Sequence, residues 1–164
     1  MAVALPDGDN WVGLFEADLP VAEALAWAVR DETGALVSFC GTVRDHSEAR
    51  DAVTALEYEA YDAQVTPRLE AIVAAARARW PEVSRVACWH RTGRLELGEV
   101  SVLVVVSSPH REEAFAAARY VIDTVKASVP IWKREHWAGG SDWALDAHEL
   151  TEVEVHSPAR GGRR

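Results

Sequence analysis

The sequence predicts an α+β fold in which helices pack on a mostly antiparallel sheet. Segments with strand-like patterns follow one another in consecutive pairs, and helical patterns interrupt these pairs, an order that is typical of this class. With 164 residues, of which 49% are hydrophobic and 26% are charged, the chain has the length and composition of one domain with a substantial core. We expect a flexible start over residues 1–10, a single domain over residues 11–150 and a flexible tail over residues 151–164.

The first half of the chain is expected to alternate strands and helices. Apolar and β-branched residues predict strands over residues 11–17, 34–43 and 53–61. Asp18 as a capping residue, with Pro20 in the first turn, predicts a helix that runs to about residue 30. A second helical pattern covers residues 66–80 and ends before Pro81, because proline disfavours helical geometry in the residue before it. The charged residues 44–51 predict an exposed loop.

The second half contains the most regular patterns. Strands are predicted over residues 83–91, 100–107 and 131–137. The strand 100–107 is apolar enough to be buried on both faces, so it is expected at the centre of the sheet. A helix that opens at Ser108-Pro109 and ends near Lys126 carries an apolar stripe at three- and four-residue steps. The stripe consists of Ala114, Phe115, Ala118, Val121, Ile122 and Val125. Beyond Gly139 the pattern weakens and no element is predicted.

The composition argues against several classes of function. Asp and Glu outnumber Lys and Arg by 26 to 17, and a net charge of −9 disfavours nonspecific binding of nucleic acid. No apolar run approaches the roughly 18 residues that a membrane span needs, so we expect a soluble, cytoplasmic protein. The two cysteines, Cys40 and Cys88, lack metal-binding spacing and fall in apolar strands, so both are expected to be buried. The histidines form no ligand pattern either, and we expect neither a metal nor a cofactor.

Lys126 and Lys133 are the strongest candidates for catalysis. Lys126 closes a predicted helix and Lys133 lies on a strand that begins one tight turn later, so the two amines could face one pocket. Two ammonium groups that are close and partly desolvated repel, which lowers the pKa of at least one and suits it to proton transfer or nucleophilic attack. The alternative is that both are solvated surface lysines, which spacing alone does not exclude.

Three further residues could bind an anion. Arg44 lies in a loop just after a strand, and His110 and Arg111 lie at the start of a helix, where free backbone N–H groups favour negative charge. His110 and Arg111 are four residues before Ala114 and Phe115, so they are expected on the side of the buried stripe. A surface charge or a capping role remains the alternative for each. Because His110 and Lys126 are about 24 Å apart along one helix, we expect that a homodimer completes the site.

The segment Lys126-Ala-Ser-Val-Pro-Ile-Trp-Lys-Arg-Glu135 resembles the active-site signature of the large, catalytic subunit of molybdopterin synthase. The resemblance covers roughly residues 34–135, which is most of the chain, with the motifs in the order of the family. It extends through Gly41-Thr-Val-Arg44-Asp-His46, Trp80-Pro81, His90-Arg91-Thr-Gly93 and Ser107-Ser-Pro-His110-Arg111. It implies an α/β-hammerhead-like fold.

The resemblance also implies an activity and roles for the site residues. The family transfers sulfur from the thiocarboxylated C-terminal glycine of a small ubiquitin-like carrier subunit to cyclic pyranopterin monophosphate. Lys126 and Lys133 would then be catalytic, and the substrate-binding residues would be Arg44, His110 and Arg111. The residues that support them would be Pro130, Trp132 and Glu135, of which Glu135 could tune or neutralise Lys133.

Two other functions remain open at this point. The chain could be a non-catalytic paralogue that serves as a binding scaffold for the carrier, although both lysines, Arg44 and His110 are retained. An unrelated acyl-transfer enzyme is disfavoured, because no Gly-x-Ser-x-Gly elbow or phosphate-cradling glycine loop is present. Gly161-Gly162 resembles the end of a carrier, but Arg163 and Arg164 follow, so we expect this chain to accept such a tail rather than to donate one.

Overall fold

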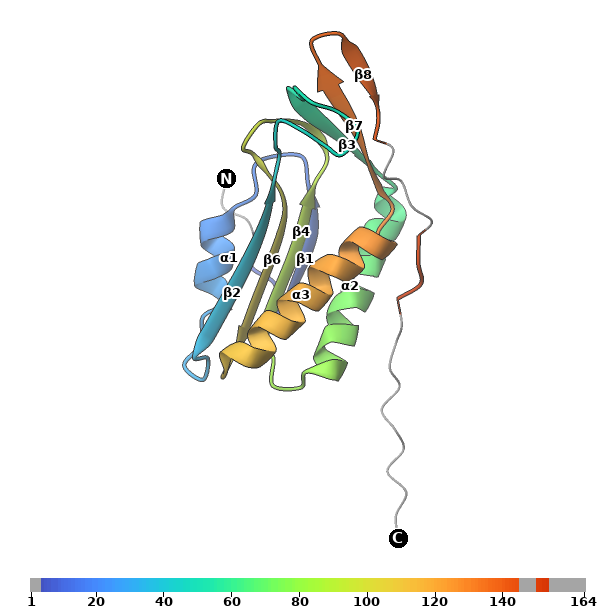
Figure 1. Ribbon diagram of the computed structural model, residues 1–164. Helices are drawn as coiled ribbons and strands as arrows, with labels where there is room; N and C mark the ends of the chain where they lie inside the picture. Colours follow the sequence, from blue (N-terminus) through green and yellow to red (C-terminus); the bar gives the residue numbers. More distant parts are fainter. Residues whose placement is uncertain (1–3, 145–149, 154–164) are drawn as a thin grey trace.

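The computed structural model describes residues 4–144 and 150–153, which contain eight strands and three helices in two sheets (Figure 1). The first sheet has the order β1 (Asn10–Phe15), β4 (Arg85–Arg91), β6 (Val100–Ser108) and β2 (Ala35–Thr42). The second has the order β5 (Gly93–Glu96), β3 (Ala55–Ala60), β7 (Ile131–Trp137) and β8 (Gly140–Trp143). Among these strands only β1 and β4 pair in parallel. The predicted α+β class with mostly antiparallel pairing is confirmed, and the strands are divided between two sheets.

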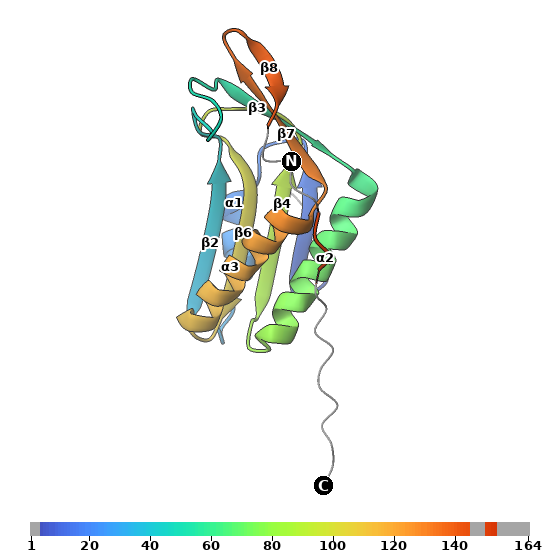
Figure 2. The same cartoon turned by 45° about the vertical axis from the view of Figure 1, so that its right-hand side comes forward.

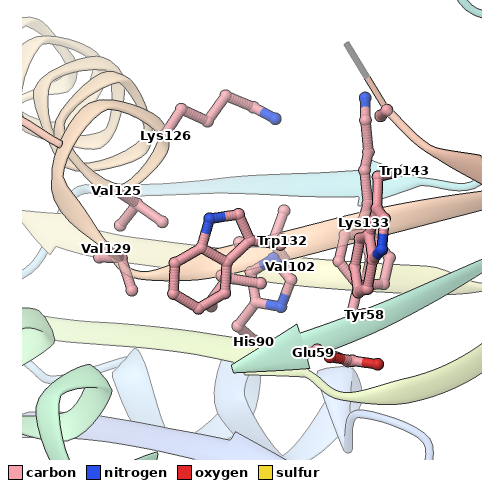
Figure 3. A pocket seen from close by; sticks show the side chains of 13 residues that line it. Tyr58, Glu59, His90, Val102, Val125, Lys126, Val129, Trp132, Lys133 and Trp143 are labelled. Carbon is pink, nitrogen blue, oxygen red and sulfur yellow. The ribbon is translucent and has the colours of Figure 1, made fainter. Parts of the chain in front are cut away.

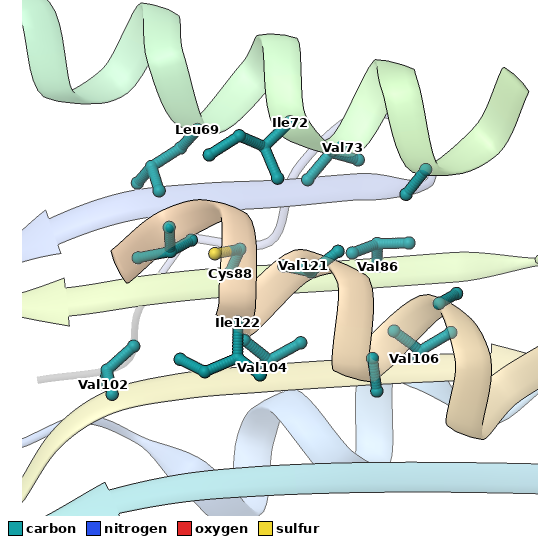
Figure 4. Close-up of a cluster of buried hydrophobic side chains, with 14 of the residues drawn as sticks. Leu69, Ile72, Val73, Val86, Cys88, Val102, Val104, Val106, Val121 and Ile122 are labelled. Atoms are coloured by element: carbon teal, nitrogen blue, oxygen red, sulfur yellow. The ribbon is translucent and has the colours of Figure 1, made fainter. Parts of the chain in front are cut away.

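Helices cover both faces of the first sheet. Helix α1 (Val21–Ala28) packs on one face, and α2 (Asp62–Arg79) and α3 (Arg111–Ser128) cross the other (Figures 1 and 2). The alternation of side chains along β6 explains how one strand serves both layers. Leu103 and Val105 face α1, whereas the neighbouring valines face α2 and α3 (Figure 4). The prediction that this strand is central and buried on both faces is therefore confirmed.

Tryptophans fill the layer beneath α1. The ring centroids of Trp11 and Trp27 are 5.3 Å apart, and those of Trp11 and Trp89 are 4.7 Å apart, both in edge-to-face contact. Such pairs add about 0.5–1.5 kcal/mol to the stabilisation that their burial supplies. This side of the sheet is consequently a compact aromatic core, and none of its buried side chains lines either of the two cavities described below.

The starts of two helices differ from the prediction. Asp18 does not cap α1; its carboxylate instead lies 3.0 Å from the guanidinium of the buried Arg91, and Pro20 occupies the capping position without a side-chain hydrogen bond. Helix α2 begins at Asp62 and contains Pro67, although the sequence suggested a start near that proline. At α1, the ion pair between Asp18 and Arg91 outweighs the preference of Asp18 for the capping position. At α2, the packing of the turn before Pro67 outweighs the preference of proline for a helix start.

Two short strands were not predicted. Strand β5 begins at Gly93, which has a φ of +81°, and Gly98, with a φ of +83°, lies in the turn between β5 and β6. Strand β8 pairs with β7 across the turn near Gly140. Both strands are four residues long and mostly exposed, so neither has the apolar alternation by which strands are recognised.

The connection between α3 and β7 is short and fixed. The Val129 N–H donates to the carbonyl of Val125, and the Ile131 N–H donates to the carbonyl of Val129. The carbonyl of Pro130 accepts from the Tyr61 N–H, which joins this turn to the start of α2. Strand β7 thus starts with a defined register, beginning at Ile131 as predicted.

The structure does not describe residues 1–3, 145–149 and 154–164, and parts of the predicted domain limits fall on these ranges. Gly161 and Gly162 lie in the last of them. Within the description, the carbonyl of Asp9 accepts from the Val86 N–H, and the Thr151 N–H donates to the carbonyl of Ala127 near the end of α3. The division into a start, one domain and a tail stays a prediction. None of the helices in the described ranges has the length and apolar character needed to cross a membrane.

Candidate active site

Lys126 and Lys133 line the same two adjoining cavities. Lys126 extends from the last turn of α3, and Lys133 rises from β7 on the side toward which Lys126 points (Figure 3). The larger cavity has a volume of about 590 Å³ and the smaller about 380 Å³, and both lysines contribute to each. The predicted shared pocket is therefore present, with Lys126 exposed and Lys133 half-buried.

These two residues are also the only lysines of the sequence, so the other 15 of its 17 basic side chains are arginines. A lysine can lose its proton when its surroundings favour the neutral amine, whereas an arginine remains charged. The ionisable amines of the side chains are thus concentrated at the cavities.

The larger cavity is mainly apolar with an aromatic rim. Trp132 and Trp143, which are 42% and 40% exposed, lie at its edge. Its other apolar lining residues are Val102, Val125, Val129 and Ile131. Apolar walls with a few converging polar groups are typical of ligand sites, here including the two amines and the His90 imidazole.

The smaller cavity is polar and contains Arg44. The Nε of Arg44 donates to the carbonyl of His46 at 3.0 Å, which fixes the side chain against its own loop. Thr42, Ser47 and Glu135 contribute further polar groups to the wall. The structure thus brings Arg44 together with both lysines, as the sequence predicted, in a place where a guanidinium could meet a phosphate or carboxylate.

His90 is a cavity residue that the sequence did not single out. Its Nδ1 lies 2.7 Å from the backbone carbonyl of Arg91, so this nitrogen donates and Nε2 is left as an acceptor. The Tyr58 ring meets the imidazole edge-on, with centroids 5.0 Å apart. The pKa of His90 is lowered to about 4, mainly by burial and to a smaller extent by the nearby charge of Lys126, against the opposing effect of the hydrogen bond. The imidazole is therefore neutral near pH 7, and its place in the His90-Arg91-Thr-Gly93 motif was the only available signal.

Glu135 has a partner other than the one expected. It lines the smaller cavity with Lys133, as the alternation of β7 predicted, and is only 4% exposed. Its Oε2 lies 3.4 Å from the Nε of Arg50, which belongs to the loop after β2. Arg50 therefore balances this buried carboxylate.

His110 and Arg111 lie apart from the lysines. Both are exposed at the start of α3, and neither lines the two cavities. Phe115, one helical turn later, is 63% exposed, so the expectation that His110, Arg111 and Phe115 share the buried side is wrong. The helix instead buries Ala114, Ala117, Ala118 and Val121, and this stripe turns the other three side chains outward.

The two cysteines have different surroundings. Cys40 is exposed on β2 and lines the smaller cavity, which corrects the expectation that it is buried. Cys88 is buried as predicted, and desolvation raises the pKa of its thiol to about 12. Across residues 4–144 and 150–153, no group of three or more His, Cys, Asp and Glu side chains is arranged to hold a metal ion.

The fold and the site together define an α+β protein whose paired amines share one cleft between an apolar and an arginine-containing cavity. Comparison with known proteins gives the family. A family model described as "MoaE protein" matches residues 14–128. The "Molybdopterin synthase catalytic subunit" of Nostoc sp. is 46% identical over 125 residues, which are 76% of this chain and 75% of that protein. The chain belongs to the MoaE protein family, and the family predicted from the sequence is confirmed.

Solved structures agree with this assignment. Molybdopterin synthase from Staphylococcus aureus has a TM-score of 0.75 and 34% identity, with 80% of this chain and 94% of that chain covered. A complex of subunits 1 and 2 of molybdopterin-converting factor from Helicobacter pylori has a TM-score of 0.70 at 24% identity, with 85% and 94% covered. At that level of identity, the second comparison shows a common fold.

Proposed function

We propose that the chain is the catalytic subunit of a molybdopterin synthase and acts as a sulfurtransferase. In this role it transfers sulfur from the thiocarboxylated C-terminus of a small ubiquitin-like carrier subunit to cyclic pyranopterin monophosphate, and forms the dithiolene of molybdopterin. The observation that carries the proposal is the placement of the only two lysines, on separate elements, around the same pair of cavities. Membership of the MoaE protein family, whose curated relatives include molybdopterin synthase catalytic subunits, supports it.

The two cavities suit the two reactants. The protein carries a net charge of −9, so an anionic substrate needs local cations, and the smaller cavity supplies Arg44 beside the lysines. The larger cavity, with Trp132 and Trp143 at its rim, offers an apolar channel for the extended tail of a carrier. The thiocarboxylate and the pterin would then meet at the wall that contains both amines.

Lys126 and Lys133 would handle charge and protons during the transfer. When the thiocarboxylate sulfur attacks a carbon of the substrate, negative charge moves to the leaving oxygen. When water then cleaves the resulting thioester, negative charge develops on the carbonyl oxygen of the carrier, which leaves as a carboxylate while the sulfur stays on the substrate. A nearby ammonium stabilises such charge or donates a proton. The neutral His90 imidazole faces the larger cavity, where it offers an acceptor and adds no positive charge to the pair.

We further propose a homodimer that completes the substrate site. His110 and Arg111 lie at the opposite end of α3 from Lys126 and cannot reach the same small molecule within one subunit. Because both are exposed, they are accessible to a second copy of the chain. In the dimer they would approach the cavities of the partner subunit and bind the phosphate.

The test is to incubate the purified chain with thiocarboxylated carrier and cyclic pyranopterin monophosphate and to assay the dithiolene product. We expect product from the wild type and a loss of roughly 100-fold or more in kcat for Lys126→Ala and Lys133→Ala. Arg30→Gln, which alters an exposed arginine paired with Asp9 and Glu32, serves as a control and should retain activity. Binding of the carrier without any product would instead favour the scaffold function.

A covalent route through one lysine is tested separately. If a lysine attacks a carbonyl of the substrate and forms a Schiff base, borohydride reduction fixes the adduct on that residue. Since the side chains of the sequence contain only two lysines, mass spectrometry of peptides assigns the adduct directly to Lys126 or Lys133. Unmodified lysines under turnover would leave proton transfer and charge stabilisation as their roles.

A further inference from the structure

Arg50 lies at the end of the loop after β2 and is held against β7 by two contacts. The central carbon of its guanidinium lies 3.5 Å from the centroid of the Trp137 ring, and its Nε lies 3.4 Å from Oε2 of Glu135. The Glu135 side chain is almost fully buried, and a buried carboxylate is stable only when a cation or hydrogen bonds compensate it. Arg50 stacks and pairs at the same time, which a planar guanidinium can do and an ammonium cannot.

The loop that contains Arg50 also carries Arg44. Within it the Ser47 N–H donates to the carbonyl of Arg50 at 2.8 Å, and the Val53 N–H donates to the carbonyl of Asp45 at 2.8 Å. The first bond closes a turn within the loop and the second joins its two ends, so hydrogen bonds connect Arg50 to the part of the loop that carries Arg44.

The same loop contains an unfavourable backbone conformation. Ala52 has a φ of +55°, in the left-handed region that side chains other than glycine rarely adopt. Such a conformation persists only where the surrounding structure holds it in place. The contacts of Arg50 with Glu135 and Trp137, two residues away from Ala52, are suited to do so.

Arg50 itself does not line the smaller cavity, whereas Arg44, Ser47 and Glu135 do. We propose that Arg50 is a positioning residue: by binding Glu135 and Trp137 it fixes the loop so that the Arg44 guanidinium faces the cavity and binds the anionic group of the substrate. This inference rests on the proposed function for the identity of the substrate. It assigns Glu135 to the support of the Arg44 loop, in addition to its place beside Lys133.

The first test measures the loop without reference to activity. Hydrogen exchange of the full chain is compared among the wild type, Arg50→Gln and the control Arg30→Gln. We expect the amides of Ser47 and Val53 to exchange roughly tenfold faster in Arg50→Gln, while those of β6 stay unchanged. Arg50→Lys, which keeps the charge and loses the planar stacking, should lie between the two, and it replaces Arg50→Gln if that variant does not fold. Unchanged exchange at Ser47 and Val53 overturns the loop-fixing role.

The second test measures substrate affinity in the complete reaction with the carrier subunit. We expect Arg50→Gln to raise the KM for cyclic pyranopterin monophosphate roughly tenfold, with kcat within about twofold of wild type. In an Arg44→Ala background the same substitution should raise KM no further, because its effect passes through Arg44. An unchanged KM, or effects of the two substitutions that multiply, overturns the positioning role.

The two tests separate this inference from the function on which it rests. A wild type that makes no product contradicts the sulfurtransferase activity, and the exchange rates of Ser47 and Val53 then still decide whether Arg50 fixes the loop. A general loss of structure in Arg50→Gln would appear as faster exchange throughout β6 and lower kcat, and this outcome also counts against a specific role.

Discussion

At the scale of single residues, the candidate site contains both lysines of a protein whose other basic side chains are all arginines. The sequence contains fifteen arginines, and several of those that the structure describes form ion pairs and backbone contacts, as Arg77 does with the carbonyls of Val83 and Ser84. The two lysines line the cavities, where the proposed function assigns proton transfer to them. Replacement of Lys133 by arginine would therefore preserve positive charge but not proton transfer.

The buried His90 predicts a dependence of stability on pH. The pKa of His90 is lowered to about 4 in the folded protein, so between pH 6.5 and 4 the unfolded chain binds a proton that the folded chain does not. Acid therefore favours unfolding over this range, and the contribution of this group to the free energy of unfolding falls by at most about 3 kcal/mol. It is fully present above pH 6.5.

Urea denaturation at pH 7 and pH 4.5 checks this prediction. His90→Gln removes the titrating group, and its free energy of unfolding should change less between the two pH values than that of the wild type. His110→Gln, which alters an exposed histidine, should behave as the wild type does. Equal pH dependence in wild type and His90→Gln would contradict the assignment.

Sequence reasoning identified the residues of the site that local structure brings together. A helix end, a proline and a strand start place Lys126 and Lys133 within a few residues of each other, and the motif made them recognisable. The contacts of Arg50 with Glu135 and the burial of His90 depend on pairing between distant strands. No periodicity in the sequence encodes those contacts, so they could not be predicted.

At the scale of elements, β6 determines the stability of the first sheet. It lies between β4 and β2 and buries side chains against α1 on one face and against α2 and α3 on the other. Its nearly continuous apolar run was sufficient to predict its central position. The short strands β5 and β8 have no such pattern, because they are held by pairing with β3 and β7 rather than by burial of their own side chains.

Leu103→Ala tests the importance of β6. Leu103 is completely buried, and its truncation leaves a cavity in the layer beneath α1. We expect a loss of about 2–5 kcal/mol in the free energy of unfolding, measured by denaturant titration. Leu97→Ala, at a side chain that is 48% exposed, should change it by no more than about 0.5 kcal/mol. Similar losses for both variants would contradict the central role of this strand.

At the scale of the whole molecule, the separation of the predicted site residues is the reason for proposing a second subunit. One chain places Arg44 with both lysines but leaves His110 and Arg111 exposed at the far end of α3. Composition and length predicted an ordinary single chain, and only the helical distance between His110 and Lys126 indicated an assembly.

Mixed dimers test the homodimer. Lys126→Ala and His110→Ala are each expected to be inactive, and after subunit exchange one of the two sites in a mixed dimer regains both residues. About half of the dimers should be mixed at equilibrium, by the statistics of closed two-fold assemblies, and product formation should return. No recovery, with exchange demonstrated by mass spectrometry, would mean that each chain acts alone.

The short connection between Ser128 and Ile131 limits which insertions and deletions the sequence can tolerate. Successive side chains of a strand point to opposite faces, so one extra codon after Ile131 would exchange the orientations of Trp132 and Lys133. The backbone hydrogen bonds of Val129 and Pro130 fix this connection, so it cannot accommodate an added residue. We therefore expect that functional variants of this protein contain no insertion or deletion in this connection, whereas substitutions at exposed positions around it are tolerated.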